Sequence, residues 1–255
     1  HQLAPLEHAL QDSWQRDKAR TSQHDPDILL LNIDERSLAE MAPQVGRWPW
    51  PRSVYADLLN GILPQHPQAV VFDVLMSDPN VEDPQGDAYF VDTATASPLV
   101  FMPMVRLEHA DDSQGLRLAD FATRLGLIRT PSANPDARVA MILPFGNLAT
   151  TGRIGTTNFL LDDDGMGRRY ALYQDVEGWH VPSLPLRLAL AFGYPLPAQQ
   201  DFLLNWGGDP VQRPSLSFVD VYRDTQREHP QGLAKSLAGK LVLIGSTAPQ
   251  LHDSV

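Results

Sequence analysis

The feature that most constrains this fold is a pair of continuous apolar runs with a helical pattern between them. Residues 28–33 read ILLLNI and residues 69–75 read AVVFDVL. A continuous run, as opposed to an alternating one, is typical of a strand that is covered on both faces. From Pro51 onward, apolar residues recur at helical spacing until Pro64 stops the pattern. Strand, helix and strand in this order predict a βαβ unit, and hence an α/β fold with a largely parallel central sheet, flanking helices and a right-handed crossover.

Further elements are predicted along the rest of the chain. The string Asp162-Asp163-Asp164-Gly165 has the composition of a tight turn, which predicts an antiparallel hairpin attached to the sheet. The apolar segment at residues 184–192 predicts a buried helix. The other predicted strands lie at residues 99–105, 139–142, 159–161, 170–174, 202–205 and 241–244.

The first 25 residues carry an apolar stripe at steps of three and four, which predicts an amphipathic helix. The stripe consists of Leu3, Leu6, Leu10 and Trp14. Two interpretations stay open: a helix packed on its own domain, or a juxtamembrane helix through which two copies dimerise. We therefore divide the chain into an N-terminal helix at 1–25 and one domain at 26–255, since no internal repeat or Gly/Ser-rich run divides it further.

The composition excludes several classes of function. The net charge of −11 disfavours binding to phosphate backbones or anionic lipid, so nucleic acid is not an expected partner. Cysteine is absent, which excludes disulfides, thiolate metal ligands and a cysteine nucleophile. The longest apolar runs are far shorter than the roughly 20 residues that span a bilayer. A cysteine-free chain fits the cytosol and the bacterial periplasm equally well.

Two aspartates are candidates for a site. No phosphate-loop, serine-hydrolase or zinc motif is present, and the eight histidines lack metal-ligand spacing, so no metal or other cofactor and no catalytic residue is expected. Asp34 and Asp73 each lie in or directly after an apolar run, at the expected carboxyl ends of adjacent parallel strands, where open α/β sheets bind ligands. Together they could hold a divalent cation or act as acid and base. The alternative is structural: Asp34 caps the next helix and Asp73 accepts hydrogen bonds from a loop.

The stretch GRWPWPR at residues 46–52 holds the other candidates. Its prolines restrict the backbone, and Trp48 and Trp50 offer large apolar surfaces, so most of the motif is expected to build a packed corner. Arg52 falls in the first turn of the predicted helix, where the helix dipole disfavours a cation. We expect it to pair with one of the two aspartates, as a structural ion pair or as part of a ligand site. Further along, Arg168 and Arg169 are expected to be exposed charges that balance the acidic turn.

Five segments of the sequence point to a known family. In chain order they are ILLLNIDERSL, RWPWPRSVYADLL, AVVFDVLMSDP, DDDGMGRRYAL and LAGKLVLIGSTA, the last followed by Asp253. In this order and separation they resemble the second type of CHASE domain, the cyclase- and histidine-kinase-associated sensory extracellular domain. The resemblance extends from about Asp27 to Asp253, and the WPWPR string is its most specific part. Members usually continue past the final aspartate, whereas this sequence stops two residues later, so we expect an excised ectodomain.

The resemblance implies a sensor and not an enzyme. Such domains lie outside the cytoplasmic membrane of bacteria, between transmembrane helices, in receptors whose cytoplasmic parts are nucleotide cyclases, protein kinases or cyclic-di-GMP enzymes. We therefore expect a periplasmic ligand-sensing domain that responds to a small molecule or a protein. We also expect a homodimer through the N-terminal helix and membrane anchoring by flanking helices in the whole receptor. The candidate ligand-binding residues are Asp34, Trp48, Trp50, Arg52 and Asp73.

Two rival functions stay open from the sequence. One is a metal-dependent hydrolase of small molecules that uses Asp34 and Asp73. The other is a scaffold that only dimerises the receptor and binds no ligand.

Overall fold

The computed structural model describes residues 10, 12–15, 17–19, 22–159, 162, 164–204, 213–227 and 232–248. At its centre is a seven-stranded sheet of order β13-β1-β14-β2-β3-β7, in which β8 also pairs with β3. Every neighbouring pair is parallel except β3 with β7, so the predicted largely parallel sheet is confirmed. The strands are β1 (Ile28–Ile33), β2 (Ala69–Phe72), β3 (Val100–Arg106), β7 (Met141–Ile142), β8 (Ile154–Thr156), β13 (Ser215–Ser217) and β14 (Leu241–Ser246).

The strand order corrects one prediction. β14 lies between β1 and β2, with Leu241 opposite Ile28 on one side and Ala69 on the other. β1 and β2 are therefore not adjacent, and the expectation that Asp34 and Asp73 follow neighbouring strands is wrong. The reason is that consecutive parallel strands in a chain need not be neighbours in the sheet, and an apolar run contains no information on which strand it pairs with.

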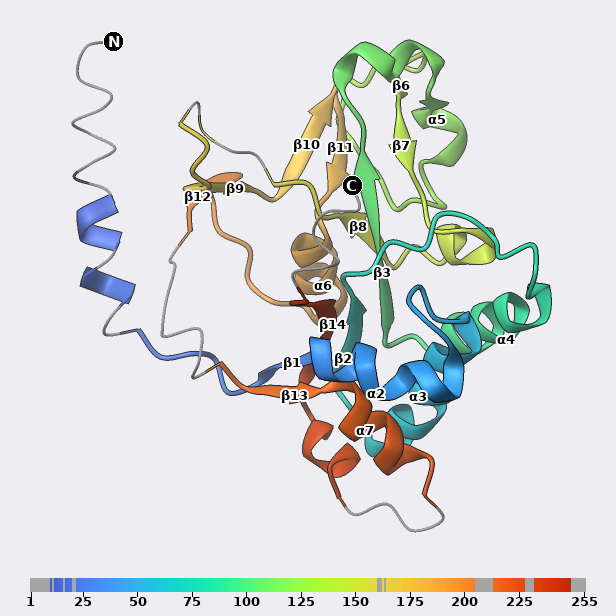
Figure 1. Cartoon of the computed structure of the whole chain (residues 1–255). Coiled ribbons are helices and arrows are strands. Elements are labelled where there is room, and N and C mark those ends of the chain that lie inside the picture. The colour runs from blue at the N-terminus through green and yellow to red at the C-terminus, as the bar shows by residue number, and fades with distance from the viewer. Residues whose placement is uncertain are drawn as a thin grey trace.

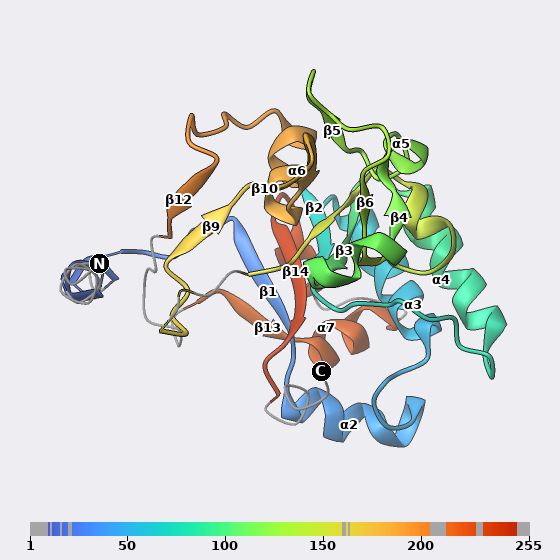
Figure 2. The ribbon, with the colours of Figure 1, turned by 90° about the horizontal axis from the view of Figure 1, so that it is seen from above.

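Helices cover the two faces of this sheet unequally. One face, called here the closed face, packs against α3 and α7, with α2 and α4 beside them. The other, called the open face, packs against α6 alone among the main helices described, and Figure 2 shows the strands between α6 on one side and α2, α3 and α7 on the other. Figure 1 shows the helices, which are α2 (Glu35–Val45), α3 (Arg52–Ile62), α4 (Pro84–Ala96), α5 (Leu118–Phe121), α6 (Leu184–Phe192) and α7 (Phe218–Thr225).

The connection between β1 and β2 contains two α-helices. The sequence predicted the second directly and offered the first only as the helix that Asp34 would cap. Asp34 is the N-cap of α2 and accepts a hydrogen bond from the Ser37 backbone N–H at 2.7 Å. Pro51 precedes α3 as its N-cap, and the helix ends before Pro64, as the apolar pattern predicts. Where α3 crosses α7, Gly61 lies so close to Thr225 that an added Cβ would come within 2.2 Å of the threonine Cβ. The absence of a side chain at this position therefore fixes how closely the two helices approach.

Three small antiparallel sheets surround the central one. The predicted antiparallel hairpin is present as β10 and β11, which a turn at Glu177 and Gly178 joins and β5 extends. This hairpin lies after the position that the sequence indicated. At the indicated position the Asp162–Met166 turn forms, but Phe159, which was expected in the strand before the turn, does not belong to a strand. The small strands are β4 (Leu116–Arg117), β5 (Ile128–Arg129), β6 (Arg138–Val139), β9 (Arg169–Ala171), β10 (Tyr173–Val176), β11 (Trp179–Pro182) and β12 (Asp201–Leu203).

Residues 12–15 and 17–19 are helical, in agreement with an N-terminal helix, whereas Leu3 and Leu6 lie outside the described residues. Leu10 and Trp14 of the predicted stripe are 72% and 58% exposed. In the ranges that the structure describes, no helix is both long enough and apolar enough to cross a membrane.

Candidate functional site

The tryptophan corner is a structural element of the closed face. Trp50 is only 2% exposed and packs with its ring centroid 5.0 Å from that of Phe218 in α7. Trp48 meets Trp50 edge to face at 5.2 Å. Tyr55 in the first turn of α3 extends the cluster toward Phe218 at 5.9 Å. The motif therefore joins α3 to α7, which agrees with the predicted packed corner.

Arg52 pairs with a carboxylate, but with a different one from those predicted. Its Nε lies 3.5 Å from Oδ1 of Asp87 in α4, and both side chains are largely buried. The guanidinium also donates to the Asp78 carbonyl at 2.8 Å and lies over the Phe145 ring at 5.2 Å. The expected pairing with Asp34 or Asp73 is wrong because α4 follows an acidic loop that returns over the start of α3. Sequence spacing could not show that return.

Asp34 performs the structural role that was the alternative in the sequence. Its carboxylate accepts hydrogen bonds from the hydroxyl of Ser37 at 2.7 Å and of Ser217 at 3.1 Å, in addition to the N-cap bond. These bonds join the end of β1 to the start of α2 and the end of β13. Oδ1 of the carboxylate thus accepts all three bonds within the protein, and, because β14 separates β1 from β2, the two aspartates do not form the joint site that a metal-dependent hydrolase would need.

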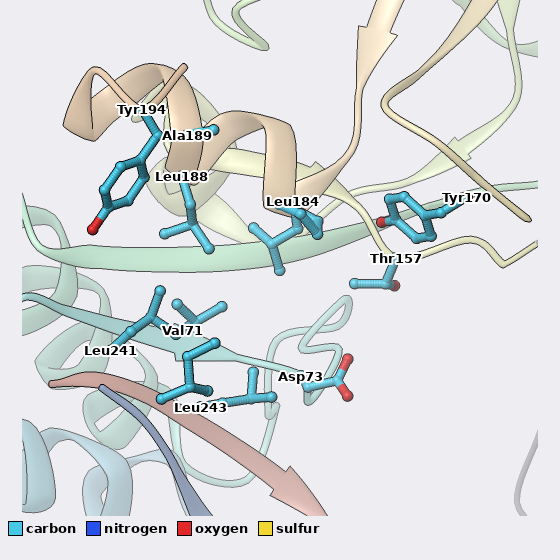
Figure 3. A pocket seen from close by; sticks show the side chains of 12 residues that line it. Val71, Asp73, Thr157, Tyr170, Leu184, Leu188, Ala189, Tyr194, Leu241 and Leu243 are labelled. Atoms are coloured by element: carbon cyan, nitrogen blue, oxygen red, sulfur yellow. The ribbon is translucent and has the colours of Figure 1, made fainter. Parts of the chain in front are cut away.

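Asp73 has a different environment, because it lines a pocket between the open face and α6. The pocket has a volume of about 450 Å³, and we call it the sheet–α6 pocket. In Figure 3 its walls are leucines of α6 and apolar side chains of the sheet, with Asp73, Thr157 and Tyr170 together at one end. The lining residues are Ile28, Val71, Asp73, Thr157, Tyr170, Leu184, Pro185, Leu188, Ala189, Tyr194, Leu241 and Leu243.

Strand periodicity explains why these side chains meet. Alternate residues of a strand point to opposite faces, so Phe72 enters the closed-face core while Val71 and Asp73 point toward α6. The same rule places Leu241 and Leu243 of β14 in the pocket. The α6 side is fixed by the close approach of its first residue to Gly155, where an added Cβ would lie 2.4 Å from the Leu184 Cα.

Of the described residues that line this pocket, Asp73 is the only charged one. Although its side chain is partly exposed, the neighbouring apolar groups desolvate it and raise its pKa above the ordinary value. Burial first, and then the charge of Asp73, also raise the pKa of the Tyr170 hydroxyl. Among the described residues none donates a hydrogen bond to the Asp73 carboxylate, so the expected bonds from a loop are absent. Only its backbone N–H is engaged, by the Ile244 carbonyl at 2.8 Å.

The segment that contains Tyr170 also contacts the N-terminal helix. Arg168, directly before β9, is only 5% exposed and is covered by the carboxylates of Asp12, Asp162 and Asp164, which it binds at 2.8–2.9 Å. Gln15 donates to the Leu204 carbonyl beside it at 2.6 Å. The expectation that Arg168 is exposed is therefore wrong, because Asp12 comes from a distant part of the chain. Arg169 is half exposed, as expected, and pairs with Asp201.

A second cavity, of about 580 Å³, lies beside the β10–β11 hairpin. Its cation, Arg106, donates to Asp112 at 2.9 Å and to Gln174 at 3.4 Å, and Asp112 accepts a further bond from the Ala140 backbone N–H. Arg106 is thus paired with a carboxylate of the same chain, in contrast to Asp73.

The structure therefore separates the five sequence candidates. Trp48, Trp50, Arg52 and Asp34 build the closed face, whereas Asp73 lines the sheet–α6 pocket. The sequence analysis missed Thr157, which lies in no motif, and Tyr170, which lies in the DDDGMGRRYAL block but was assigned no role. The one signal in the sequence was the alternation of side chains along a strand. Asp73 is two residues after Val71 and therefore points to the same face of the sheet.

Comparison with known proteins gives one match. The family model of the CHASE2 domain, an extracellular sensory domain, matches residues 1–255, the whole chain. The search of curated proteins and the search of solved structures gave no match.

Proposed function

The chain belongs to the CHASE2 domain family of extracellular sensory domains, and from this premise we propose that it is the periplasmic ligand-sensing part of a bacterial transmembrane receptor. In this proposal the ligand binds in the sheet–α6 pocket. The signal passes through membrane helices at its ends to a cytoplasmic cyclase, kinase or cyclic-di-GMP module. The domain itself belongs to a sensory family and carries out no reaction.

The observation that carries the proposal is that β9 and the residue before it connect the pocket with the N-terminal helix. Tyr170 lines the pocket, and Arg168, two residues earlier, binds Asp12 of the N-terminal helix. A change in the position of Tyr170 would therefore reach the helix through one short, hydrogen-bonded segment. Leu204, whose backbone N–H binds the Arg168 carbonyl at 2.8 Å, contacts Gln15 of the same helix.

A ligand can shift the helix only if it binds two arrangements of the domain with different affinities. The attachment of the described part of the helix is suited to two arrangements because its contacts with the domain are directional polar ones. In this part of the helix, Asp12 and Gln15 face the body of the domain. Contacts of this kind can be exchanged without unfolding the core.

The exposed side of this helix supports a homodimer. Leu10 and Trp14 point away from the domain while Asp12 and Gln15 bind it. Two helices that met along this stripe would bury apolar surface that is otherwise in water. Light scattering at several protein concentrations, on the wild type and on Trp14→Glu, tests this part: the variant should be monomeric where the wild type is dimeric.

The sensing function is tested by measuring the helix directly. Because the chain has no cysteine, spin labels can be attached at Ser13→Cys on the helix and Asp92→Cys on α4, both exposed positions. Compounds that raise the thermal midpoint are first selected from metal ions, nucleotides, sugars, amino acids, organic acids and amines, since a ligand of the native state must stabilise it.

We expect a selected compound to change the distance between the labels, and the change to be lost in Arg168→Gln, which breaks the contact with Asp12. A compound that stabilises the domain and leaves the distance unchanged in the wild type would contradict signal transfer through this helix.

A further inference from the structure

We propose that the sheet–α6 pocket binds a small apolar molecule that carries one cationic nitrogen, with the nitrogen paired to the Asp73 carboxylate. This inference rests on the proposed sensing function and defines the chemical class of its ligand. The lining contains one carboxylate, eight apolar residues, two tyrosines and a threonine, and none of its described residues is a lysine, arginine or histidine.

The arrangement of the lining gives the orientation of such a ligand. The apolar side chains of α6 and of the sheet enclose the middle of the pocket, whereas Asp73, Thr157 and Tyr170 lie together at one end and Tyr194 at the other (Figure 3). A volume of about 450 Å³ lies toward the small end of the roughly 300–1,000 Å³ of small-molecule sites. The apolar part of a compact ligand would therefore lie under Leu184 and Leu188, with its polar end at Asp73.

Asp73 selects the sign of that polar end. A carboxylate beside apolar groups has lost part of its hydration, and none of the described residues supplies a hydrogen bond in return. A cationic N–H donor would replace the missing hydration with a charge-assisted hydrogen bond. An anionic ligand would instead place a second negative charge beside the first, and a neutral apolar one would remove more water without compensation. The Tyr170 ring adds a surface that attracts cations.

A metal ion fits this end less well than an organic cation. Calcium takes six to eight oxygen ligands and magnesium demands a near-octahedral set, whereas one carboxylate and apolar walls offer few. Across the described residues, no group of three or more His, Asp or Glu side chains could hold a metal ion. The lack of other ligands thus favours a cation that brings its own apolar body.

The position of Gly245 leaves room beside the carboxylate. A Cβ added to this residue of β14 would lie 3.6 Å from the Asp73 Cβ and 3.7 Å from Oδ2, in ordinary contact without overlap. The native glycine therefore leaves one side of Asp73 uncovered. Gly245→Ala can narrow this end of the pocket while keeping the fold.

Three probes of similar shape and different charge test the ligand class: phenethylamine, 2-phenylethanol and 3-phenylpropionate, each titrated calorimetrically into the intact chain at pH 7. We expect the amine to bind at least about tenfold more tightly than the alcohol, as one added charge-assisted hydrogen bond gives, and the acid to bind most weakly. Asp73→Asn should remove the preference for the amine. Asp92→Asn makes the same charge change on the exposed side of α4 and should keep it.

The outcomes separate the ligand class from the sensing function. Equal or tighter binding of the acid or the alcohol, unchanged amine affinity in Asp73→Asn, or no amine binding up to millimolar concentration overturns the inference. If the acid or the alcohol binds and Ala189→Trp, which fills the pocket, abolishes that binding, the pocket and the proposed function stand with a different ligand class. The spin-label distance measured with that probe then tests the function independently.

Discussion

The two faces of the central sheet differ in how completely they are covered. On the closed face Trp50, Tyr55, Phe72, Phe90 and Phe218 pack ring against ring, and all are buried. On the open face the buried cluster is small and consists of Ala69, Val71, Phe101, Leu184 and Leu188. The closed face therefore supplies rigidity, and the open face keeps the space in which a ligand can bind.

Strand β1 shows the same contrast within six residues. Leu29, Leu31 and Ile33 are buried on the closed side, while Ile28 and Leu30 on the other side remain accessible. Apolar side chains on an incompletely covered face cost free energy unless something covers them. The open face thus retains apolar surface that the fold does not use, which is the physical basis for expecting a ligand there.

The largest effect is expected from Trp50→Ala. Removing this buried side chain leaves a cavity between α3 and α7 and should cost about 3–5 kcal/mol of the free energy of unfolding. The control is Val81→Ala at a fully exposed position, where the expected loss is below about 0.5 kcal/mol. Urea denaturation followed by circular dichroism measures both. Similar losses for the two variants would mean that the corner is not the structural centre of the closed face.

Arg52→Ala should follow, with a loss of about 3 kcal/mol, because it leaves the largely buried Asp87 without its partner. On the side of the open face, Arg169 pairs with Asp201 while both are about half exposed, so Arg169→Ala should cost only about 0–1 kcal/mol. The double variant Arg52→Ala/Asp87→Ala should recover part of the loss in the same urea experiment. No recovery would show that Arg52 stabilises α3 through Phe145 and Asp78 instead.

The elements with a strong local pattern could be predicted from the sequence. The apolar runs of β1, β2 and β14, the helix α6 and the start of α3 at Pro51 are each set by residues within the element. The order of the strands could not be predicted, because pairing partners are chosen by long-range packing. For this reason the sequence analysis placed Asp34 beside Asp73 and did not predict that β14 lies between their two strands.

The candidate site was predictable in one residue only. Asp73 was singled out by its position after an apolar strand, which holds for any parallel sheet. Thr157 comes from an irregular connection and Tyr170 from the short strand β9, and the path of both segments past Asp73 depends on tertiary contacts. Arg52 pairs with Asp87 and Arg168 pairs with Asp12. These partners are far away along the chain, so no sequence motif could indicate them.

Glycine substitutions compare the packing of the two faces with the same chemical change. Gly61→Ala would place its Cβ 2.2 Å from the Thr225 Cβ, so α3 and α7 must separate; overpacking of this kind costs about 1–3 kcal/mol. Gly245→Ala meets Asp73 only at 3.6 Å and should change the free energy of unfolding by less than about 0.5 kcal/mol. Equal destabilisation by both would show that the open face is as tightly packed as the closed one.

The smallest expected effect concerns the charge of Asp73 and its dependence on pH. Because desolvation raises the pKa of Asp73 in the folded state, folding favours the protonated form, and the stability this gives is present at low pH and lost as the pH rises through the folded pKa. Among the described lining residues, the other titratable groups are the hydroxyls of Tyr170 and Tyr194, and burial raises the pKa of Tyr170. Asp73→Asn cannot ionise, so it should be slightly more stable than the wild type at pH 7, and the difference should vanish below about pH 4.

Thermal midpoints from pH 3 to 8, with Asp92→Asn as the control for net charge, measure this difference in stability. A wild type that gained stability over Asp73→Asn as the pH rose would mean that the carboxylate is stabilised by the fold, and the open face would then contain no unpaired charge for a ligand to meet.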